Sequence, residues 1–182
     1  MAGRNSVGVF LAVGSNIEPE RNVRRALELL IKHVHVAATS TFYRTAPLRR
    51  PQDPPFANGI WRIETDTGPR PLKFDVLRGI EDELGRVRTA DAYAPRTIDL
   101  DIAVYGEQRI EDEDLVIPDP DILERPFLAV PLLELAPDLR LPGTDRPLRQ
   151  YPVSERTDEL EPMRGLTEQL KETLHYERRA SR

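Results

Sequence analysis

The stretch Ala94-Pro95-Arg96-Thr97-Ile98-Asp99-Leu100-Asp101-Ile102-Ala103-Val104-Tyr105 alternates apolar and acidic residues in its middle. An alternation with a period of two is typical of a half-buried β-strand. It turns Asp99 and Asp101 toward one face of the sheet and their apolar neighbours toward the other. Carboxylates two residues apart on a strand lie roughly 6.5–7 Å apart at the backbone. Their side chains can therefore converge on one hard cation or hold a pair of cations.

Arginines gather around this acidic pair. Arg96 lies in the same stretch, and Arg86 and Arg88 come shortly before it. Aspartate is depleted in strands, and a solvated outer face is the simplest explanation for the two aspartates taken alone. A surface ion pair is likewise the alternative role of each arginine. Carboxylates that hold a divalent cation close to several arginines are, however, what a polyphosphate substrate requires.

The composition is that of a globular protein that lacks cysteine. The chain has 182 residues, 39% of them hydrophobic and 31% charged, which is enough for one domain with a core. The absence of cysteine excludes disulfides and thiolate metal sites. The three histidines lack the clustering of a zinc site.

Charge and hydropathy narrow the choice of partners and compartment. The net charge of −5 argues against a general nucleic-acid-binding surface. No apolar run is long enough for a transmembrane helix, and the N-terminus lacks the pattern of a signal peptide. We therefore expect a cytoplasmic protein that binds neither nucleic acid nor a membrane. The expected oligomeric state is a monomer or a weak homo-oligomer.

The order of elements predicts an α+β fold. Apolar runs and alternating patterns indicate strands at residues 7–13, 33–48, 56–65 and 98–105. Helices are expected from Pro19 to about 31 and from Pro69 to about 84, where Gly85 ends the second one. The resulting βαββαβ order is that of a ferredoxin-like sandwich, with an antiparallel sheet and two helices on one face.

Extra elements follow this core toward the C-terminus. Residues 127–135 are apolar and predict a short helix interrupted by Pro131, and residues 136–152 look irregular. We divide the chain into a domain at residues 1–152 and a charged tail at 153–182, which is expected to be helical because its leucines are spaced like one amphipathic helix. Three fates are open for this tail: docking on the domain, pairing with another chain, or remaining mobile.

Several motifs in the right order carry a resemblance to a known family. They are Leu11-Ala12-Val13-Gly14-Ser15-Asn16, Tyr43-Arg44-Thr45-Ala46-Pro47-Leu48, Phe56-Ala57-Asn58, Gly85-Arg86-Val87-Arg88, Pro95-Arg96-Thr97-Ile98-Asp99-Leu100-Asp101 and the segment from Pro118 to Phe127. Together they resemble the 6-hydroxymethyl-7,8-dihydropterin pyrophosphokinase family of folate biosynthesis, from about Val9 to about Leu148. The resemblance implies a ferredoxin-like fold and the transfer of pyrophosphate from ATP to a reduced pterin.

The resemblance also implies the residues of the phosphate-transfer site. Asp99 and Asp101 match the metal-binding pair, which would hold two Mg²⁺ ions. The implied catalytic residues are Arg86, Arg96, Asp99 and Asp101. Contacts with ATP are implied for Glu81, Arg88, Tyr93, Arg96, Ile102, Asp119 and Arg125. Arginine suits this task because its planar fork grips phosphate oxygens in two places.

On the pterin side, the implied residues are Thr45, Leu48, Phe56, Asn58 and Phe127. An amide such as that of Asn58 donates and accepts at once, as the edge of a pterin ring requires. The two phenylalanines would stack on the ring. From the residues alone, plain core packing is the preferred explanation for both phenylalanines.

The chain departs from the family pattern at a few positions. Asp119 stands where the family usually has histidine, Arg49 where it has glycine, and Tyr93-Ala94 where it has Trp-Gly. Asp119 is expected to pair with Arg125 or a ribose hydroxyl; a position near the phosphates and a solvated turn are the alternatives. A non-catalytic ferredoxin-like module that binds a ligand remains a competing function, as does a family member with another substrate.

Overall fold

The computed structural model describes residues 6–47, 50–91 and 94–180. Its main sheet is built on β1 (Val7–Ser15), which lies between β4 (Phe56–Thr65) and β5 (Asp99–Tyr105). The order β5-β1-β4-β3-β8 continues through β3 (Tyr43–Thr45) to β8 (Glu161–Pro162), while β2 (His35–Thr39) also pairs with β4. Every pairing among the described strands is antiparallel, as expected for the predicted α+β class.

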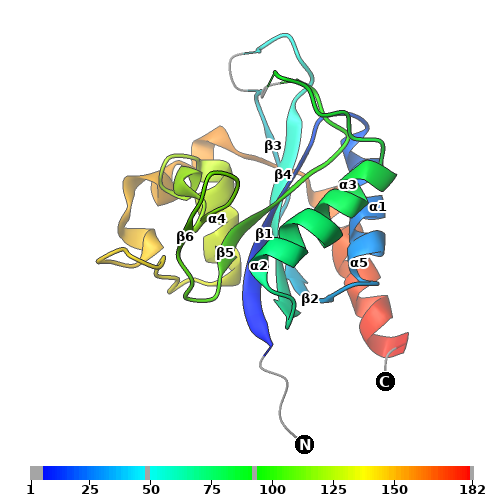
Figure 1. Ribbon diagram of the computed structural model, residues 1–182. Coiled ribbons are helices and arrows are strands. Elements are labelled where there is room, and N and C mark those ends of the chain that lie inside the picture. Colours follow the sequence, from blue (N-terminus) through cyan, green and yellow to red (C-terminus); the bar gives the residue numbers. More distant parts are fainter. Residues whose placement is uncertain (1–5, 48–49, 92–93, 181–182) are drawn as a thin grey trace, which may run out of the picture.

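Helices cover both faces of this sheet (Figure 1). One face packs against α1 (Pro19–Leu30), the helix formed by α2 (Pro69–Pro71), η1 (Leu72–Leu77) and α3 (Arg78–Glu83), and α5 (Arg164–Ala180). The opposite face packs against α4 (Pro126–Leu135) and the short 3₁₀ turns η3 (Leu148–Gln150) and η4 (Pro152–Glu155). Alternate strand residues feed these two cores, as the period of two predicts.

Small elements complete the chain around this frame. A two-stranded ribbon of β6 (Ile110–Glu111) and β7 (Val116–Ile117) follows β5. It leads into the 3₁₀ turn η2 (Pro120–Leu123), and η5 (Thr157–Glu159) precedes β8. No helix in the described part of the chain is long and apolar enough to cross a membrane.

The predicted long strand at 33–48 is wrong as a single element. It is broken into β2 and β3, because residues 40–42 leave the ladder so that the Phe42 ring packs directly beneath Gly59. A Cβ at Gly59 would lie 2.6 Å from that ring. Ser40 bridges the break, since its N–H donates to the carbonyl of Ile60 and its hydroxyl accepts from the Ile60 N–H. The β-branched and aromatic residues here predict strand structure but carry no sign of this close approach.

The helix α4 is continuous, and the predicted interruption at Pro131 is wrong. Pro131 lacks the N–H that an interior helical residue donates. The helix tolerates this loss because it is held by burial: Leu128, Ala129, Pro131 and Leu132 are all buried. At its C-terminal end, Glu134 accepts a hydrogen bond of 2.8 Å from the Thr41 N–H and one from the hydroxyl of Tyr43. These bonds fix α4 against the β3 side of the sheet.

The C-terminal segment docks on the sheet, which is the first of its three expected fates. Leu166, Leu170 and Leu174 of α5 are buried in the same apolar core as α1. The Thr167 hydroxyl accepts a hydrogen bond of 2.9 Å from the Phe42 N–H, and β8 pairs with β3. The segment at 153–182 is therefore part of the fold in its described residues.

Substitution of one buried leucine of α5 tests this docking. Leu170 is fully buried, so Leu170→Ala should lower the free energy of unfolding by about 2–5 kcal/mol through lost apolar contact and a cavity. Leu123→Ala is the matched control, since Leu123 is 38% exposed and should cost far less. Urea denaturation measures both values. Equal, small losses would mean that α5 does not contribute to the core.

Candidate active site

The register of three strands brings Asn58, Asp99 and Asp101, three of the predicted site residues, close together. Gly14 of β1 lies opposite Asn58 of β4 on one side and opposite Asp99 of β5 on the other. Ala12 lies opposite Asp101 in the same way. With strands about 4.8 Å apart, the amide of Asn58 and the carboxylate of Asp99 are two strand spacings apart. Gly14 keeps the floor between them open, because a Cβ there would lie 2.8 Å from Asn58 Oδ1.

A partly apolar cavity of about 280 Å³, which we call the aromatic cavity, lies over these residues. Phe56 from β4 and Phe127 from the first turn of α4 line it together with Thr45 and Asn58. The amide nitrogen of Asn58 donates to the hydroxyl of Thr45 at 2.7 Å, which fixes the orientation of the amide. Four of the five residues predicted for the pterin thus line one cavity. The fifth, Leu48, lies outside the described residues.

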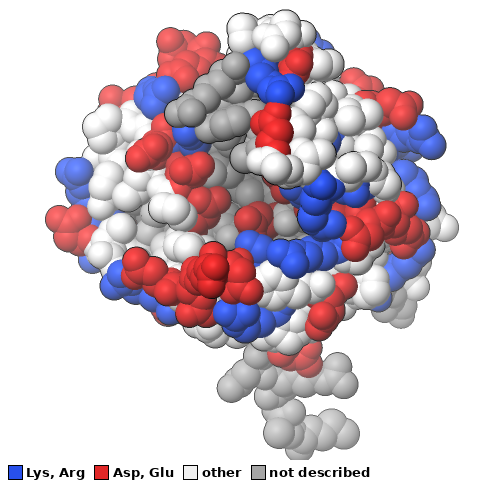
Figure 2. All heavy atoms as spheres, turned by 45° about the horizontal axis from the view of Figure 1, so that its top comes forward, with Lys and Arg blue, Asp and Glu red and all other residues white. Residues whose placement is uncertain are grey.

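A second, strongly charged cavity of about 370 Å³ lies beside the first, which we call the polar cavity. Basic and acidic side chains lie close together around a hollow at this end of the molecule (Figure 2). The cations that line the polar cavity are Lys73, Arg78, Arg86, Arg88 and Arg96. Arg96, Asp99 and Asp101 line both cavities, so the two adjoin at the acidic end of β5.

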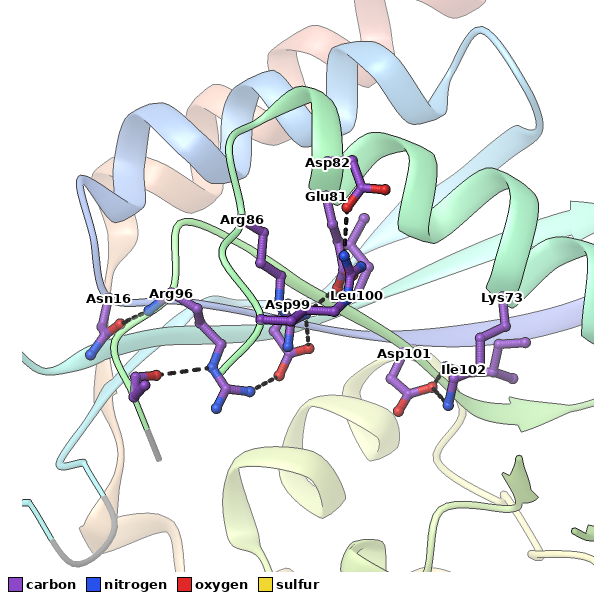
Figure 3. A network of polar contacts seen from close by, with 12 residues as sticks. Asn16, Lys73, Glu81, Asp82, Arg86, Arg96, Asp99, Leu100, Asp101 and Ile102 are labelled. Atoms are coloured by element: carbon purple, nitrogen blue, oxygen red, sulfur yellow. Dashed lines mark hydrogen bonds and ion pairs between the residues drawn. The ribbon is translucent and has the colours of Figure 1, made fainter. Parts of the chain in front are cut away.

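Asp99 is held between two arginines (Figure 3). Arg86 Nη1 lies 2.5 Å from Asp99 Oδ1, and Arg96 Nη1 forms an ion pair with Asp99 Oδ2. The arginines come from opposite ends of the loop between α3 and β5. The predicted grouping of Arg86, Arg96 and Asp99 is therefore present in the structure. In this state the carboxylate and the guanidinium groups neutralise one another.

The loop after β1 positions Arg96. Asn16 Oδ1 accepts a hydrogen bond of 2.8 Å from the Arg96 N–H, and the Asn16 N–H donates to the Arg96 carbonyl. The Ser15 hydroxyl donates to the carbonyl of Thr97 at 2.6 Å. In the sequence, Ser15 and Asn16 stand out only as part of a family motif, and this role was not predicted. The burial of Asn16, a polar residue with a long-range partner, is visible only in three dimensions.

Glu81 pairs with two of the arginines that line the polar cavity. Its buried carboxylate accepts a hydrogen bond of 2.8 Å from the Leu100 N–H, forms an ion pair with Arg86, and lies 2.5 Å from Arg88 Nη2. Burial raises the pKa of Glu81, against the opposing influence of the Leu100 N–H and the arginines. Because Glu81 is engaged with the protein on several sides, it acts on a ligand in this state through Arg86 and Arg88.

Asp101 has a partner that sequence reasoning missed. Lys73 Nζ of η1 lies 3.0 Å from Asp101 Oδ1, and that same oxygen accepts a hydrogen bond of 2.8 Å from the Ile102 N–H. The sequence signal was weak, since Lys73 is only a polar residue within an apolar helical pattern. The predicted alternation of this strand is confirmed. Leu100 and Ile102 face the core that contains α1 and α5, while the two aspartates face the cavities.

The remaining predicted ATP contacts are spread around the site. The side chain of Ile102 is buried in the core, so only its backbone is available to a ligand. Arg125 lies beside the acidic group of η2, with its Nε 3.9 Å from Asp121 Oδ2, and it does not line either of the two cavities in the described part of the chain. Tyr93 lies outside the described residues.

Asp119 caps η2 and does not pair with Arg125, so the first of its two expected partners is wrong, while the ribose hydroxyl stays a prediction. Its Oδ1 accepts a hydrogen bond of 2.9 Å from the Asp121 N–H, and its side chain lines the aromatic cavity. A short polar side chain is favoured at such a cap because it bonds its own backbone two residues on. Burial raises the pKa of Asp119 to about 6, and the negative charges of Asp101 and Asp121 add to the rise.

The donor set at β5 fits a hard cation that brings other ligands with it. Among the described residues, no group of three or more His, Asp or Glu side chains is arranged to hold a metal ion by itself. Asp99 and Asp101 offer two carboxylates at the junction of the cavities. Mg²⁺ is commonly bound by one or two carboxylates, with water and substrate phosphates as its other ligands. The pair therefore suits a cation that arrives with a polyphosphate.

The sequence matches the family model of 7,8-dihydro-6-hydroxymethylpterin-pyrophosphokinase (HPPK) over residues 10–137. The chain belongs to this family. The 2-amino-4-hydroxy-6-hydroxymethyldihydropteridine pyrophosphokinase of Haemophilus influenzae is 39% identical over 141 residues, which are 76% of this chain and 87% of that protein. The folic acid synthesis protein of Pneumocystis carinii is 39% identical over 145 residues, but this HPPK chain covers only 19% of it.

Solved structures show the same fold. Wild-type HPPK-DHPS of Plasmodium falciparum, crystallised with pterin and p-hydroxybenzoate, has a TM-score of 0.65 to this HPPK chain at 14% identity. The match covers 86% of this chain and 42% of the Plasmodium chain. At such low identity the likeness extends to the fold alone.

The raised pKa of Asp119 predicts a pH-dependent stability. The native state holds a proton on Asp119 more tightly than the unfolded state, whose carboxyl has a pKa of 3.8. Stability should therefore fall as the pH rises from about 4 to about 6, and remain reduced above that window. Asp119→Asn removes the charge and can still cap η2. In metal-free buffer it should be more stable than wild type at pH 7.5, with the gain vanishing near pH 4.

Urea denaturation at both pH values checks this expectation. Asp138→Asn is the matched control, because the Asp138 side chain is 90% exposed and its pairing with Arg149 is a surface contact. It should show no pH-dependent gain. A loss of stability for Asp119→Asn at pH 7.5 would contradict the account.

Proposed function

We infer that this chain transfers diphosphate from ATP to 6-hydroxymethyl-7,8-dihydropterin, giving AMP and the pterin diphosphate in folate biosynthesis. The observation that carries this conclusion is the pair of adjoining cavities that share Arg96, Asp99 and Asp101. One cavity is lined by aromatic and amide groups and the other by guanidinium groups. A reaction between a flat heterocycle and a polyphosphate needs two such compartments that meet at the reacting atoms.

The aromatic cavity supports the pterin half of the proposal. Phe56 and Phe127 offer ring faces from β4 and α4, and stacking on a heterocycle requires only such faces. Asn58, held by Thr45, offers a fixed donor and acceptor for the ring edge. With the ring in this place, a hydroxymethyl group on its edge would point toward the shared carboxylates.

The polar cavity supports the nucleotide half. Arg86, Arg88 and Arg96 already hold their charges in ion pairs with carboxylates, so the site does not carry a large unbalanced charge without ligands. We propose that the triphosphate takes these guanidinium groups and that Asp99 and Asp101 hold two Mg²⁺ ions. Magnesium in such a site would neutralise phosphate oxygens and stabilise charge that develops during transfer.

In the proposed reaction the chain mainly positions the two substrates. In the proposed step the pterin hydroxyl oxygen forms a bond to the β-phosphorus, the hydroxyl proton is lost, and the bond from that phosphorus to the oxygen bridging to the α-phosphorus breaks. AMP leaves with the bridging oxygen. In this proposal Arg86 and Arg96 would bind phosphate oxygens that gain charge, which is where preorganised donors contribute most to catalysis.

The proposal also covers the fold type, the cellular location and the oligomeric state of the enzyme. The strand order, with β1 and β4 in the centre and β5 and β3 outside them, supports the ferredoxin-like type of sandwich. We expect action in the cytoplasm, where ATP is available, and a monomer or weak homo-oligomer. Residues 1–152 would carry the substrate sites and residues 153–182 would complete the core.

Conservative substitution of the shared carboxylates tests the function. Asp99→Asn and Asp101→Asn should each reduce kcat by at least about 100-fold, the usual scale for losing one group that stabilises a transition state. Both side chains are partly exposed, so the fold should persist, as thermal unfolding would show. AMP release with ATP, Mg²⁺ and the pterin alcohol measures kcat. Asp75→Asn, an exposed change on η1, is the control and should leave kcat unchanged.

Three outcomes would contradict the proposal. Turnover within tenfold of wild type in both variants would exclude the metal-binding role of the pair. Binding of a non-hydrolysable ATP analogue without any binding of the pterin by the wild-type protein would favour another alcohol as substrate. Absence of binding of either ligand would favour a non-catalytic module.

A further inference from the structure

Lys73 has a place in the site that the proposed reaction does not use. Its ammonium group lies 3.0 Å from Asp101 Oδ1, and it lines the polar cavity together with four arginines. The Lys73 side chain is only 18% exposed, whereas that of Asp101 is 46% exposed. A lysine that is largely covered and directed at a carboxylate is held there by the surrounding structure (Figure 3).

The backbone of η1 explains how Lys73 reaches the site. Residues 72–77 form a π-helical turn, in which the Arg78 N–H donates to the carbonyl of Lys73 itself. Leu72 and Leu77 are both fully buried, although residues five apart on an α-helix would point about 140° away from each other. The wider turn lets both leucines enter the core and leaves Lys73 on the side toward β5. Such π-helical turns are frequent at functional sites.

The ammonium competes for an oxygen that a cation would need. Asp101 Oδ1 already accepts the Ile102 N–H and the Lys73 ammonium. Asp119 lies close enough for its charge and that of Asp101 to influence each other, and Lys73 partly offsets this repulsion. A divalent cation that binds Asp101 must therefore displace Lys73 or share the carboxylate with it, and the second choice places two cations side by side.

We propose that Lys73 is an exchangeable counter-ion: it pairs with Asp101 in the cation-free protein, is displaced by a divalent cation, and then binds a phosphate oxygen of the nucleotide. This inference rests on the proposed function and assigns a positioning residue to it. The flexible four-carbon stem of lysine suits a move between two anionic partners. The nucleotide then restores the partner that the cation removed, which couples the binding of the two ligands favourably.

The proposal predicts effects of opposite sign for the two ligands. In Lys73→Met, Mn²⁺ alone should bind about two- to fivefold more tightly, because no ammonium competes for Asp101. Electron paramagnetic resonance counts free and bound Mn²⁺ directly. The α,β-methylene analogue of ATP, titrated calorimetrically at saturating Mg²⁺, should bind about two- to tenfold more weakly, since one phosphate contact is lost. A purely structural role of Lys73 would weaken both ligands.

Matched variants separate charge from packing. Lys73→Arg keeps the cation and should return both affinities toward those of wild type. Lys171→Met removes a lysine that pairs with Glu168 on the exposed side of α5, and it should change neither affinity. Lys73→Gln provides a second neutral variant in case Lys73→Met folds poorly, as judged by thermal unfolding. Asp101→Asn should abolish the difference in Mn²⁺ affinity between lysine and methionine at position 73.

Two results would overturn the inference. Unchanged or weaker Mn²⁺ binding in folded Lys73→Met and Lys73→Gln would exclude competition, and unchanged binding of the analogue would exclude the phosphate contact. Turnover of the wild-type protein, assayed in the same preparation, keeps the two proposals apart. If the wild-type protein turns over and the Lys73 variants bind Mn²⁺ as the wild type does, this inference alone is refuted. Opposite-sign effects without turnover support the exchange and refute the proposed reaction.

Discussion

The register of β1 between β4 and β5 is the constraint on which the site depends. It sets Gly14 between Asn58 and Asp99, so that an amide, a bare stretch of backbone and a carboxylate follow one another across the sheet. A slip of one residue on either side would turn one of these side chains into the opposite core. Leu11 and Val13 are buried on the face of the sheet that packs against α1 and α5. Their burial and the ladder hydrogen bonds therefore also hold the two cavities against each other.

Charge compensation is the second principle of this site. Without ligands, each carboxylate that would hold a cation is paired with a cationic side chain that would hold a phosphate: Asp99 with Arg86 and Arg96, and Asp101 with Lys73. Bringing like charges together unpaired would be costly in a partly buried place. A magnesium-bound polyphosphate carries both kinds of charge and can replace these internal pairs. The site is thus stable when empty and remains complementary to its proposed ligand.

The sequence predicted what depends on local pattern and missed what depends on distant partners. The alternation around Asp99 and Asp101 correctly placed them on one face, and Pro19, Pro69 and Gly85 marked helix ends close to the observed ones. The break between β2 and β3 arises from the contact of Phe42 with Gly59, 17 positions along the chain, and no local signal reports it. The contacts of Lys73 and Asp119 were likewise missed, because a π-helical turn and a capping bond determine where their side chains point.

The central claim is that the aromatic and polar cavities bind the two substrates of one reaction and meet at the acidic end of β5. A crystal structure of the protein with 6-hydroxymethyl-7,8-dihydropterin, the α,β-methylene analogue of ATP and Mg²⁺ tests it most directly. The account predicts the pterin ring beside Phe56, Asn58 and Phe127, the triphosphate among Arg86, Arg88 and Arg96, and the pterin hydroxyl facing the β-phosphorus next to Asp99 and Asp101. A nucleotide base in the aromatic cavity, or a triphosphate that makes no contact with these arginines, would contradict it.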